Sequence, residues 1–141
     1  PLYDEPFVVV MPKDHELTKL KSIQAEMLPD QDLLLLGEGH CFRDQVLELC
    51  PALSQQQNNR VGSVTQGSSL ETLKYMVATG LGITVLPESA VGNLDSNLIT
   101  TRPFASPAPF RTVALAWRAS FPRGKAIDLL LDTAGTCLIK P

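Results

Sequence analysis

Apolar residues occur along the chain in short blocks that predict alternating strands and helices. The run FVVVM at 7–11 is rich in β-branched residues and is followed by a proline, which is typical of a strand. Further strands are predicted at 32–36 (DLLLL), 61–64 (VGSV), 82–87 (GITVLP) and 112–117 (TVALAW). Apolar residues at helical spacing, or turn residues at both ends, predict helices at 17–28, 41–49, 68–80 and 124–135.

The segment 68–80, SSLETLKYMVATG, carries the clearest helical signal. Ser68 and Glu71 have the spacing of a capping box, and Gly80 lies where a helix commonly ends. Leu73 and Val77 belong to an apolar stripe along one face. The last predicted helix likewise gathers four apolar residues on one face: Ile127, Leu130, Leu131 and Ala134.

The alternation of strands and helices predicts an α/β fold with a largely parallel sheet. In such folds ligands bind at the carboxyl ends of strands, beside the N-termini of helices. The sequence LLLLGEGHC places Cys41 at such a position, because a strand, a glycine-rich turn and a helix start follow one another there.

Two of the three cysteines lie in one short segment, GEGHCFRDQVLELCP at 37–51. If a helix begins at Cys41, the Cα atoms of Cys41 and Cys50 are about 13.5 Å apart along its axis. A disulfide needs Cα atoms within about 7 Å, so these thiols cannot bond while the helix is intact. Cys50 falls on the apolar stripe and is expected in the core, whereas Cys41 is expected on the polar side or in a cleft.

The surroundings of Cys41 suit a reactive thiol. A helix N-terminus and the nearby His40 and Arg43 favour the thiolate, while Glu38 and Asp44 oppose it. A thiolate reacts with peroxide to give a sulfenic acid, which condenses with a second thiol. The alternative is that the cysteines only pack as small hydrophobic side chains, which the apolar stripe favours for Cys50. We expect Cys137 either to pack or to be a thiol near the chain end without a role.

Composition narrows the function classes. The 141 residues carry a net charge of −3, which argues against direct binding of nucleic acid by this chain. Three cysteines suit a reducing cytoplasm better than a secreted disulfide framework, and no apolar run is long enough to span a membrane. His15 and His40 are the only histidines and no C-x-x-C pair occurs, so we expect no metal site and no cofactor. The chain starts at Pro1 without a Met, so we expect it to be part of a longer protein.

GHCFRDQVLELC, followed by SSLETLKYMVATGLGITVLP, resembles the sensor domain of the OxyR family, the hydrogen-peroxide-responsive LysR-type transcriptional regulators. PLYDEPFVVVMPKDHEL and FRTVALAWR are similar to LysR-type sequences, so the resemblance covers nearly the whole chain. The GHC-x-RDQ…C element is specific to the peroxide sensors. The SLETL…GxGITxLP element is general to LysR-type regulators.

The resemblance implies roles for individual residues. Cys41 would be the thiol that peroxide oxidises, and Cys50 the thiol that resolves it by forming a disulfide. Six residues would surround Cys41 or face the neighbouring effector cleft: His40, Arg43, Asp44, Arg111, Ser69 and Thr72.

The resemblance also implies a fold of two Rossmann-like lobes of the periplasmic-binding-protein type. Residues 1–7 would cross over from the first lobe, and 8–83 would form the complete second lobe with the redox helix. Residues 84–141 would return to a partial first lobe, with the DNA-binding domain absent.

The implied function is a stoichiometric thiol redox sensor, not an enzyme, in a transcriptional activator of the bacterial cytoplasm with no membrane contact. Its partners would be hydrogen peroxide, promoter DNA through an absent N-terminal winged helix-turn-helix, and RNA polymerase. A thiol reductant such as glutaredoxin would reverse the oxidation, and the protein would be a homodimer or homotetramer. Two alternatives stay open: a small-molecule-binding LysR-type effector domain with inert cysteines, and a thiol-dependent peroxidase, which the distance between the thiols disfavours.

Overall fold

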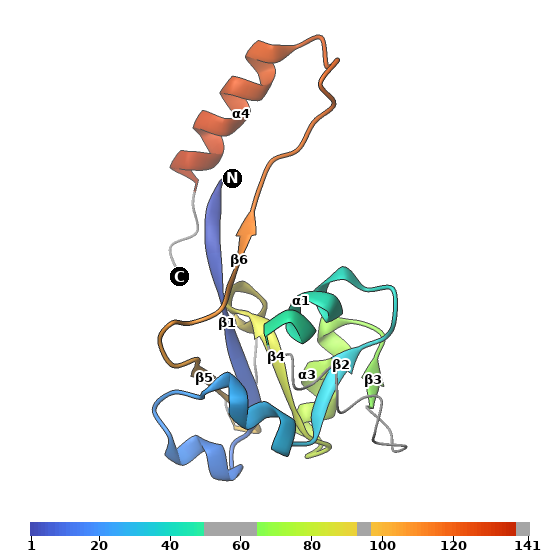
Figure 1. The fold of residues 1–141 in the computed structure, drawn as a ribbon, viewed down its shortest axis with the longest axis vertical. Helices are drawn as coiled ribbons and strands as arrows, with labels where there is room; N and C mark the ends of the chain where they lie inside the picture. Colours follow the sequence, from blue (N-terminus) through green and yellow to red (C-terminus); the bar gives the residue numbers. More distant parts are fainter. Residues whose placement is uncertain (50–64, 93–96, 138–141) are drawn as a thin grey trace.

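The computed structural model describes residues 1–49, 65–92 and 97–137. Within these ranges six strands form one sheet in the order β3-β2-β4-β1-β5, and β6 pairs with β1 alone (Figure 1). The strands are β1 (Tyr3–Pro12), β2 (Leu33–Leu36), β3 (Gln66–Gly67), β4 (Ile83–Pro87), β5 (Ile99–Pro103) and β6 (Phe110–Val113). The prediction of an α/β fold is confirmed. The predicted strand at 61–64 lies outside the described residues.

The sheet is mixed, so the prediction of a largely parallel sheet is wrong. β2 runs parallel to β3 and β4, whereas β1 is antiparallel to β4, β5 and β6. β4 is buried along its whole length and β1 is buried from Phe7 to Met11. Burial on both faces fits a strand of either direction, so the apolar pattern could not give the direction of pairing.

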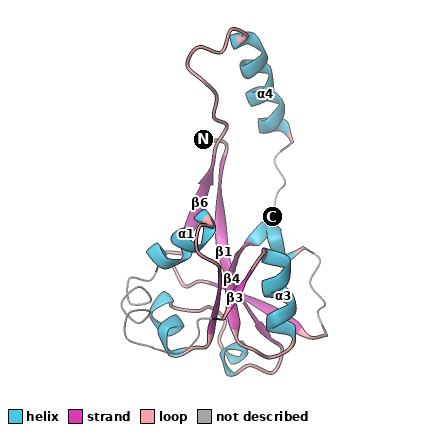
Figure 2. Cartoon of the chain, turned by 90° about the vertical axis from the view of Figure 1, so that its right-hand side faces the viewer, coloured by secondary structure: helices cyan, strands magenta, loops and turns pink. Residues whose placement is uncertain are grey.

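Helices cover both faces of the sheet. α1 (Cys41–Leu49) and α3 (Leu70–Ala78) lie on opposite sides of it, which is plain when the sheet is seen edge-on (Figure 2). The connections explain this arrangement. From β2 the chain moves outward to β3 and then back past β2 to β4, and right-handed crossovers in opposite directions place their helices on opposite faces.

The helix predicted over 17–28 is wrong. Two short 3₁₀ helices occupy this region, η1 (Glu16–Lys19) and η2 (Ala25–Asp30), and a third, η3 (Glu88–Val91), follows β4. Ile23 lies between η1 and η2. Its backbone N–H donates a hydrogen bond to the Pro103 oxygen, and its own oxygen accepts one from the Ala105 N–H. These bonds hold Ile23 extended beside the end of β5, and an α-helix there would break them.

The helix predicted at 68–80 is confirmed as α3, with a different cap. Ser69 is the N-cap, and its hydroxyl accepts a hydrogen bond from the Thr72 backbone N–H at 3.1 Å. The capping box expected from Ser68 and Glu71 therefore lies one residue too early. Gly80 has a φ of 80° just beyond the helix, as its predicted place at the C-terminal end requires.

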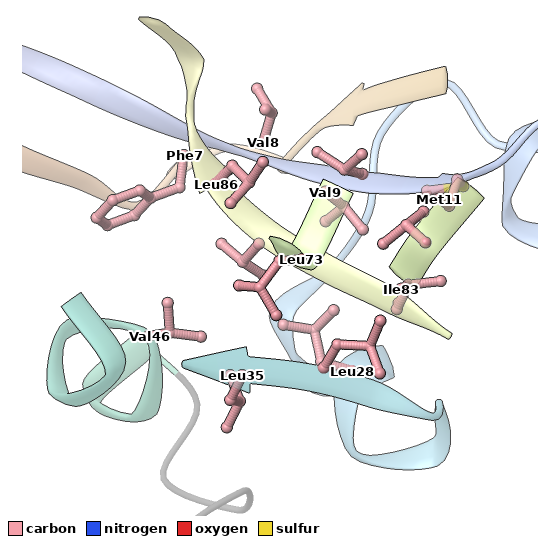
Figure 3. Packing of buried hydrophobic residues seen from close by; sticks show 14 of the residues in the cluster. Phe7, Val8, Val9, Met11, Leu28, Leu35, Val46, Leu73, Ile83 and Leu86 are labelled. Carbon is pink, nitrogen blue, oxygen red and sulfur yellow. The ribbon is translucent and has the colours of Figure 1, made fainter. Parts of the chain in front are cut away.

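One hydrophobic core lies between the sheet and its helices (Figure 3). It joins apolar side chains from β1, β2, β4, α1, α3 and η2, among them Phe7, Val9, Met11, Leu28, Leu35, Val46, Leu73, Ile83 and Leu86. Val46 anchors α1, because its side chain is almost fully buried in this cluster. The core thus fixes both helices whose N-termini lie at the carboxyl ends of β2 and β3.

Beyond Phe104 the chain forms an extended arm, residues 105–137, that carries β6 and then α4 (Gly124–Thr136) (Figure 1). β6 pairs with residues 3–6 of β1, and Leu2 donates the last backbone hydrogen bond of this ladder to Val113. The strand predicted at 112–117 is confirmed only up to Val113, since no strand among the described residues lies beside the chain farther on. On α4 Ile127 is buried, but Leu130 of the predicted apolar face is 54% exposed.

Candidate functional site

The predicted strand, turn and helix start around Cys41 are present. β2 ends at Leu36, a turn spans residues 37–40, and α1 begins at Cys41. Cys41 is exposed and has a free thiol, as the helical pattern predicted. His40 and Asp44, on either side of it in sequence, are also exposed. The thiol therefore combines access to solvent with the positive end of the helix dipole.

Arg43 ties α1 to the sheet. Its side chain is buried, and Nη1 donates a hydrogen bond of 2.9 Å to the backbone oxygen of Leu36, the last residue of β2. A guanidinium in this position satisfies a buried carbonyl and restrains the first turn of α1. Arg43, two positions after Cys41 in the chain, therefore holds the first turn of α1 to the end of β2.

Phe42 anchors the same turn from the other side. Its ring packs edge-to-face on the ring of Phe7, with centroids 5.6 Å apart. The guanidinium carbon of Arg111 lies 5.9 Å from the centroid of the Phe42 ring, which is cation–π distance. Arg111 is therefore brought to the residue that follows Cys41, although the two are far apart in sequence.

Glu5 is a residue of this site that the sequence reasoning missed. Its side chain is buried, with a relative exposure of 4%, and its Oε2 accepts a hydrogen bond of 2.7 Å from Arg111 Nε. The same oxygen lies 2.7 Å from Arg111 Nη2 in a salt bridge. Its Oε1 accepts a further bond of 3.1 Å from the backbone N–H of Ser89 in η3. The alternation of β1 offered a signal, because Glu5 and Phe7 are two residues apart and so face the same side.

The carboxyl group of Glu5 is held in its ionised form. Burial by itself would raise its pKa, but the hydrogen bonds from Ser89 and Arg111 and the charge of Arg111 outweigh this and lower the pKa below its ordinary value. A charged acid and a charged arginine thus lie together directly behind the first turn of α1.

Ser69 and Thr72 lie at the start of α3, which opens from the same edge of the sheet. Gly37 N–H donates a hydrogen bond of 3.1 Å to the Gly67 oxygen, so the turns before the two helices are joined. The Ser69 and Thr72 hydroxyls are 3.0 Å apart, and the hydrogen bonds described for them stay within the first turn of α3. The structure thus places both helix starts at one edge, as expected for the carboxyl ends of parallel strands.

The remaining cysteines divide. Cys50, the predicted partner of Cys41, lies outside the described residues. Cys137 is exposed just beyond the end of α4, so of the two expectations for it, packing is wrong and an exposed thiol near the chain end fits. In the described part of the chain, no helix has the length and apolar character that crossing a bilayer requires.

The chain is similar to known regulatory proteins over nearly its whole length. The family model described as the LysR substrate binding domain matches residues 1–136. A probable hydrogen peroxide-inducible genes activator of Streptomyces viridosporus is 42% identical over 132 residues, which is 92% of this chain and 41% of the relative. The DNA-binding transcriptional dual regulator OxyR of Escherichia coli is 34% identical over 133 residues, 94% of this chain and 42% of the relative. The chain thus spans less than half the length of these relatives.

Solved structures give the same result. The reduced OxyR regulatory domain from Pseudomonas aeruginosa is 53% identical, with a TM-score of 0.82 over 100% of this chain and 65% of its own. A reduced form of OxyR from N. meningitidis is 42% identical, with a TM-score of 0.87 over 96% of this chain and 63% of its own. A hydrogen-peroxide-bound cysteine mutant of Corynebacterium glutamicum OxyR is 33% identical, with a TM-score of 0.84 over 96% of this chain and 43% of its own. The chain therefore belongs to the LysR substrate binding domain family, and within that family it is similar to the regulatory domains of OxyR proteins.

Proposed function

We propose that this chain is the peroxide-sensing part of a LysR-type transcriptional activator, in which oxidation of Cys41 and a Cys41–Cys50 disulfide form the signal. The observation that carries the proposal is the position of Cys41, an exposed free thiol at the first residue of α1. The names of the relatives support it, since they are hydrogen peroxide-inducible activators. The peroxide-bound OxyR structure adds that a protein of this fold holds hydrogen peroxide.

The chemistry has two steps. The Cys41 thiolate attacks one oxygen of hydrogen peroxide, the O–O bond breaks, and the sulfur becomes a sulfenic acid while hydroxide leaves and takes up a proton to form water. The Cys50 sulfur then attacks the Cys41 sulfur and releases the second oxygen as water, which completes a disulfide. One peroxide is consumed per domain, and a thiol reductant such as glutaredoxin supplies the two electrons that restore the dithiol.

The second step requires α1 to rearrange. α1 is helical from Cys41 to Leu49, and these eight helical steps correspond to a rise of about 12 Å. The Cα atom of Cys50 is bonded one residue farther, about 3.8 Å from that of Leu49, so it stays more than about 8 Å from that of Cys41 while α1 is helical. The two Cα atoms must come within about 7 Å for the sulfurs to bond. The helix must therefore unwind, and the bond from Arg43 to Leu36 and the packing of Phe42 on Phe7 are the contacts that would give way.

The residues around α1 have roles that follow from their chemistry. His40 and Asp44 are exposed polar neighbours of Cys41 in the chain. Arg43 holds the first turn of α1 to Leu36, and Arg111 lies against Phe42. Ser69 and Thr72 add hydroxyls at the neighbouring helix start, where they can bind peroxide oxygens or another small polar ligand.

The rest of the proposal concerns the whole regulator. The arm, 105–137, would pack within a first lobe, which fits the exposed apolar side chains of Trp117, Phe121, Leu129 and Leu130. Residues 1–7 would cross between the lobes, and the second lobe would run from residue 8. We propose that the return to the first lobe, expected near residue 84, begins after Pro103, because β5 still pairs with β1 in the sheet that carries α1. The regulator would be a homodimer or homotetramer in the bacterial cytoplasm that binds promoter DNA through a winged helix-turn-helix and acts on RNA polymerase.

Peptide mass spectrometry after a short stoichiometric pulse of hydrogen peroxide tests the proposal. The parent protein should give a Cys41–Cys50 disulfide, Cys50→Ser should stop at a sulfenic acid on Cys41, and the matched control Cys137→Ser should behave like the parent. Thiols at Cys41 and Cys50 that stay reduced would refute the proposal and favour a small-molecule effector domain. Rapid turnover of many peroxide molecules with a dithiol reductant would instead indicate a peroxidase.

A further inference from the structure

Glu5 lies where β1 changes partners. Residues 7–12 of β1 pair with β4 and β5 in the main sheet, whereas residues 3–6 pair with β6 at the base of the arm. Glu5 is directly opposite Arg111 in the β1–β6 ladder. The pair therefore marks the junction between the sheet that carries α1 and the arm.

At this junction Glu5 fixes the position of Arg111. Arg111 Nε donates a hydrogen bond to one carboxylate oxygen, and Nη2 forms a salt bridge with the same oxygen. The backbone N–H of Ser89 in η3 donates to the other oxygen. An arginine side chain that is one-third exposed would otherwise sample many rotamers. Anchored in this way, its guanidinium remains over the ring of Phe42, the neighbour of Cys41.

We propose that Glu5 is a positioning residue for the redox helix: it holds Arg111 against Phe42 and thereby stabilises the helical form of the first turn of α1. Its bearing on disulfide formation rests on the function proposed above. Since α1 must unwind before Cys41 and Cys50 can bond, each contact made only by the helical form disfavours the disulfide. Glu5 thus acts on the sensor through Arg111, without touching the thiol itself.

The neighbouring cross-strand pair supplies a matched control. One position along the same ladder, Thr112 Oγ1 donates a hydrogen bond of 2.6 Å to Asp4 Oδ1, and this pair is exposed. Glu5→Gln and Asp4→Asn both replace an acid by its amide in the same strand. A loss of charge or a weakened β1–β6 ladder would affect both variants, whereas release of Arg111 from Phe42 would affect Glu5→Gln alone.

The first measurement is hydrogen exchange of the α1 amides in the reduced protein, followed by mass spectrometry. A cation–π contact of ordinary strength predicts that Glu5→Gln speeds exchange in residues 41–49 about three- to fivefold. Asp4→Asn should leave that exchange unchanged, and the amides of α3 should not respond in either variant. Glu5→Asp, which keeps the charge, should recover part of the protection. Arg111→Gln should have the same effect as Glu5→Gln, and the double variant should add little.

The second measurement is the midpoint potential of the Cys41–Cys50 couple in a glutathione buffer. A three- to fivefold loss of the helical form makes the dithiol less stable, so the potential of Glu5→Gln should become more negative by about 15 to 20 mV. Unchanged α1 exchange, or an equal response to Asp4→Asn, would overturn the proposal. Faster α1 exchange in variants that form no disulfide would support the positioning role of Glu5 and refute the redox function.

Discussion

Replacing Gly82 by alanine tests whether the junction of β2 and β4 is as tight as the structure indicates. Gly82 precedes β4 and lies against the backbone of Asp32, just before β2. A Cβ atom there would overlap the Asp32 carbonyl oxygen and lie 3.1 Å from its carbonyl carbon. That carbonyl also accepts a hydrogen bond of 2.9 Å from the N–H of Ile83, so it cannot move away without weakening the pairing.

The expected cost follows from these contacts. Forcing a methyl group into a packed site costs about 1–3 kcal/mol, and losing the hydrogen bond from Ile83 costs about 1 kcal/mol more. The stiffer unfolded chain returns about 0.4–1 kcal/mol. Gly82→Ala should therefore lower the free energy of unfolding by about 1–3.5 kcal/mol, a large part of the 5–15 kcal/mol typical of a domain.

Gly92 is the matched control. Its φ of −59° and ψ of −18° suit alanine, and no atom lies within 4 Å of an added Cβ. Gly92→Ala should leave the stability unchanged or raise it by about 0.4–1 kcal/mol. Urea unfolding followed by circular dichroism should then separate the two midpoints by about 1–2 M. If the two variants unfold within about 0.5 kcal/mol of each other at an equal m value, the close approach of Gly82 to Asp32 is refuted.

Three further predictions concern α3 and Glu5. Ser69→Ala should cost about 1 kcal/mol of unfolding free energy in urea titrations because Ser69 caps α3, whereas Ser68→Ala should cost clearly less; equal losses would count against the observed cap. Leu73→Ala should cost about 2–5 kcal/mol since Leu73 is 1% exposed, while Tyr75→Ala, at 73% exposure, should stay within about 0.5 kcal/mol; similar losses would contradict the packing of α3. Because its pKa is lowered in the folded state, Glu5 stabilises the protein above its ordinary pKa of 4.5, and this contribution is lost as the pH falls below 4.5. The difference in urea midpoint between the parent and Glu5→Gln should therefore shrink on acidification, and a difference that stays constant from pH 7 to pH 3 would exclude the ionised carboxylate as its source.

The sequence predicted correctly those helices and strands that are marked by their own residues and by the residues directly beside them. The helix at 41–49 was found with its observed bounds, because a glycine-rich turn precedes it and Pro51 follows it. The apolar runs of β2 and β4 were found for the same reason. By contrast, the apolar residues of 17–28 have helical spacing, but the pairing of Ile23 with Phe104, a residue far along the chain, keeps the backbone extended there. β5, with the sequence ITTRP, has too few apolar residues to be recognised as a strand and owes its structure to β1.

The residues of the candidate site also fall into two groups, those that local sequence predicts and those that depend on distant pairing. Cys41 and its helix start are local, and sequence reasoning found both. Arg111 was placed near Cys41 only through resemblance to a known family, since 69 positions separate it from Phe42 in the numbering. Glu5 was missed altogether, because Arg111, which neutralises this buried acid, lies 106 residues away in the sequence. Which charges come together was decided by the β1–β6 pairing, which the apolar pattern did not contain.

Because α1 is short, its stability depends on contacts with residues that are distant in the sequence. A helix of nine residues has little stability of its own in water, so α1 persists because its side chains are anchored to the rest of the fold. The anchors are Val46 in the core, Arg43 on β2, and Phe42 between Phe7 and Arg111. Each contributes on the order of 1–3 kcal/mol, so the helical and rearranged forms can be balanced closely enough for a single disulfide to choose between them. Under the proposed function, residues beside the thiol would set its reactivity, whereas residues as remote as Glu5 would set the threshold for the conformational change.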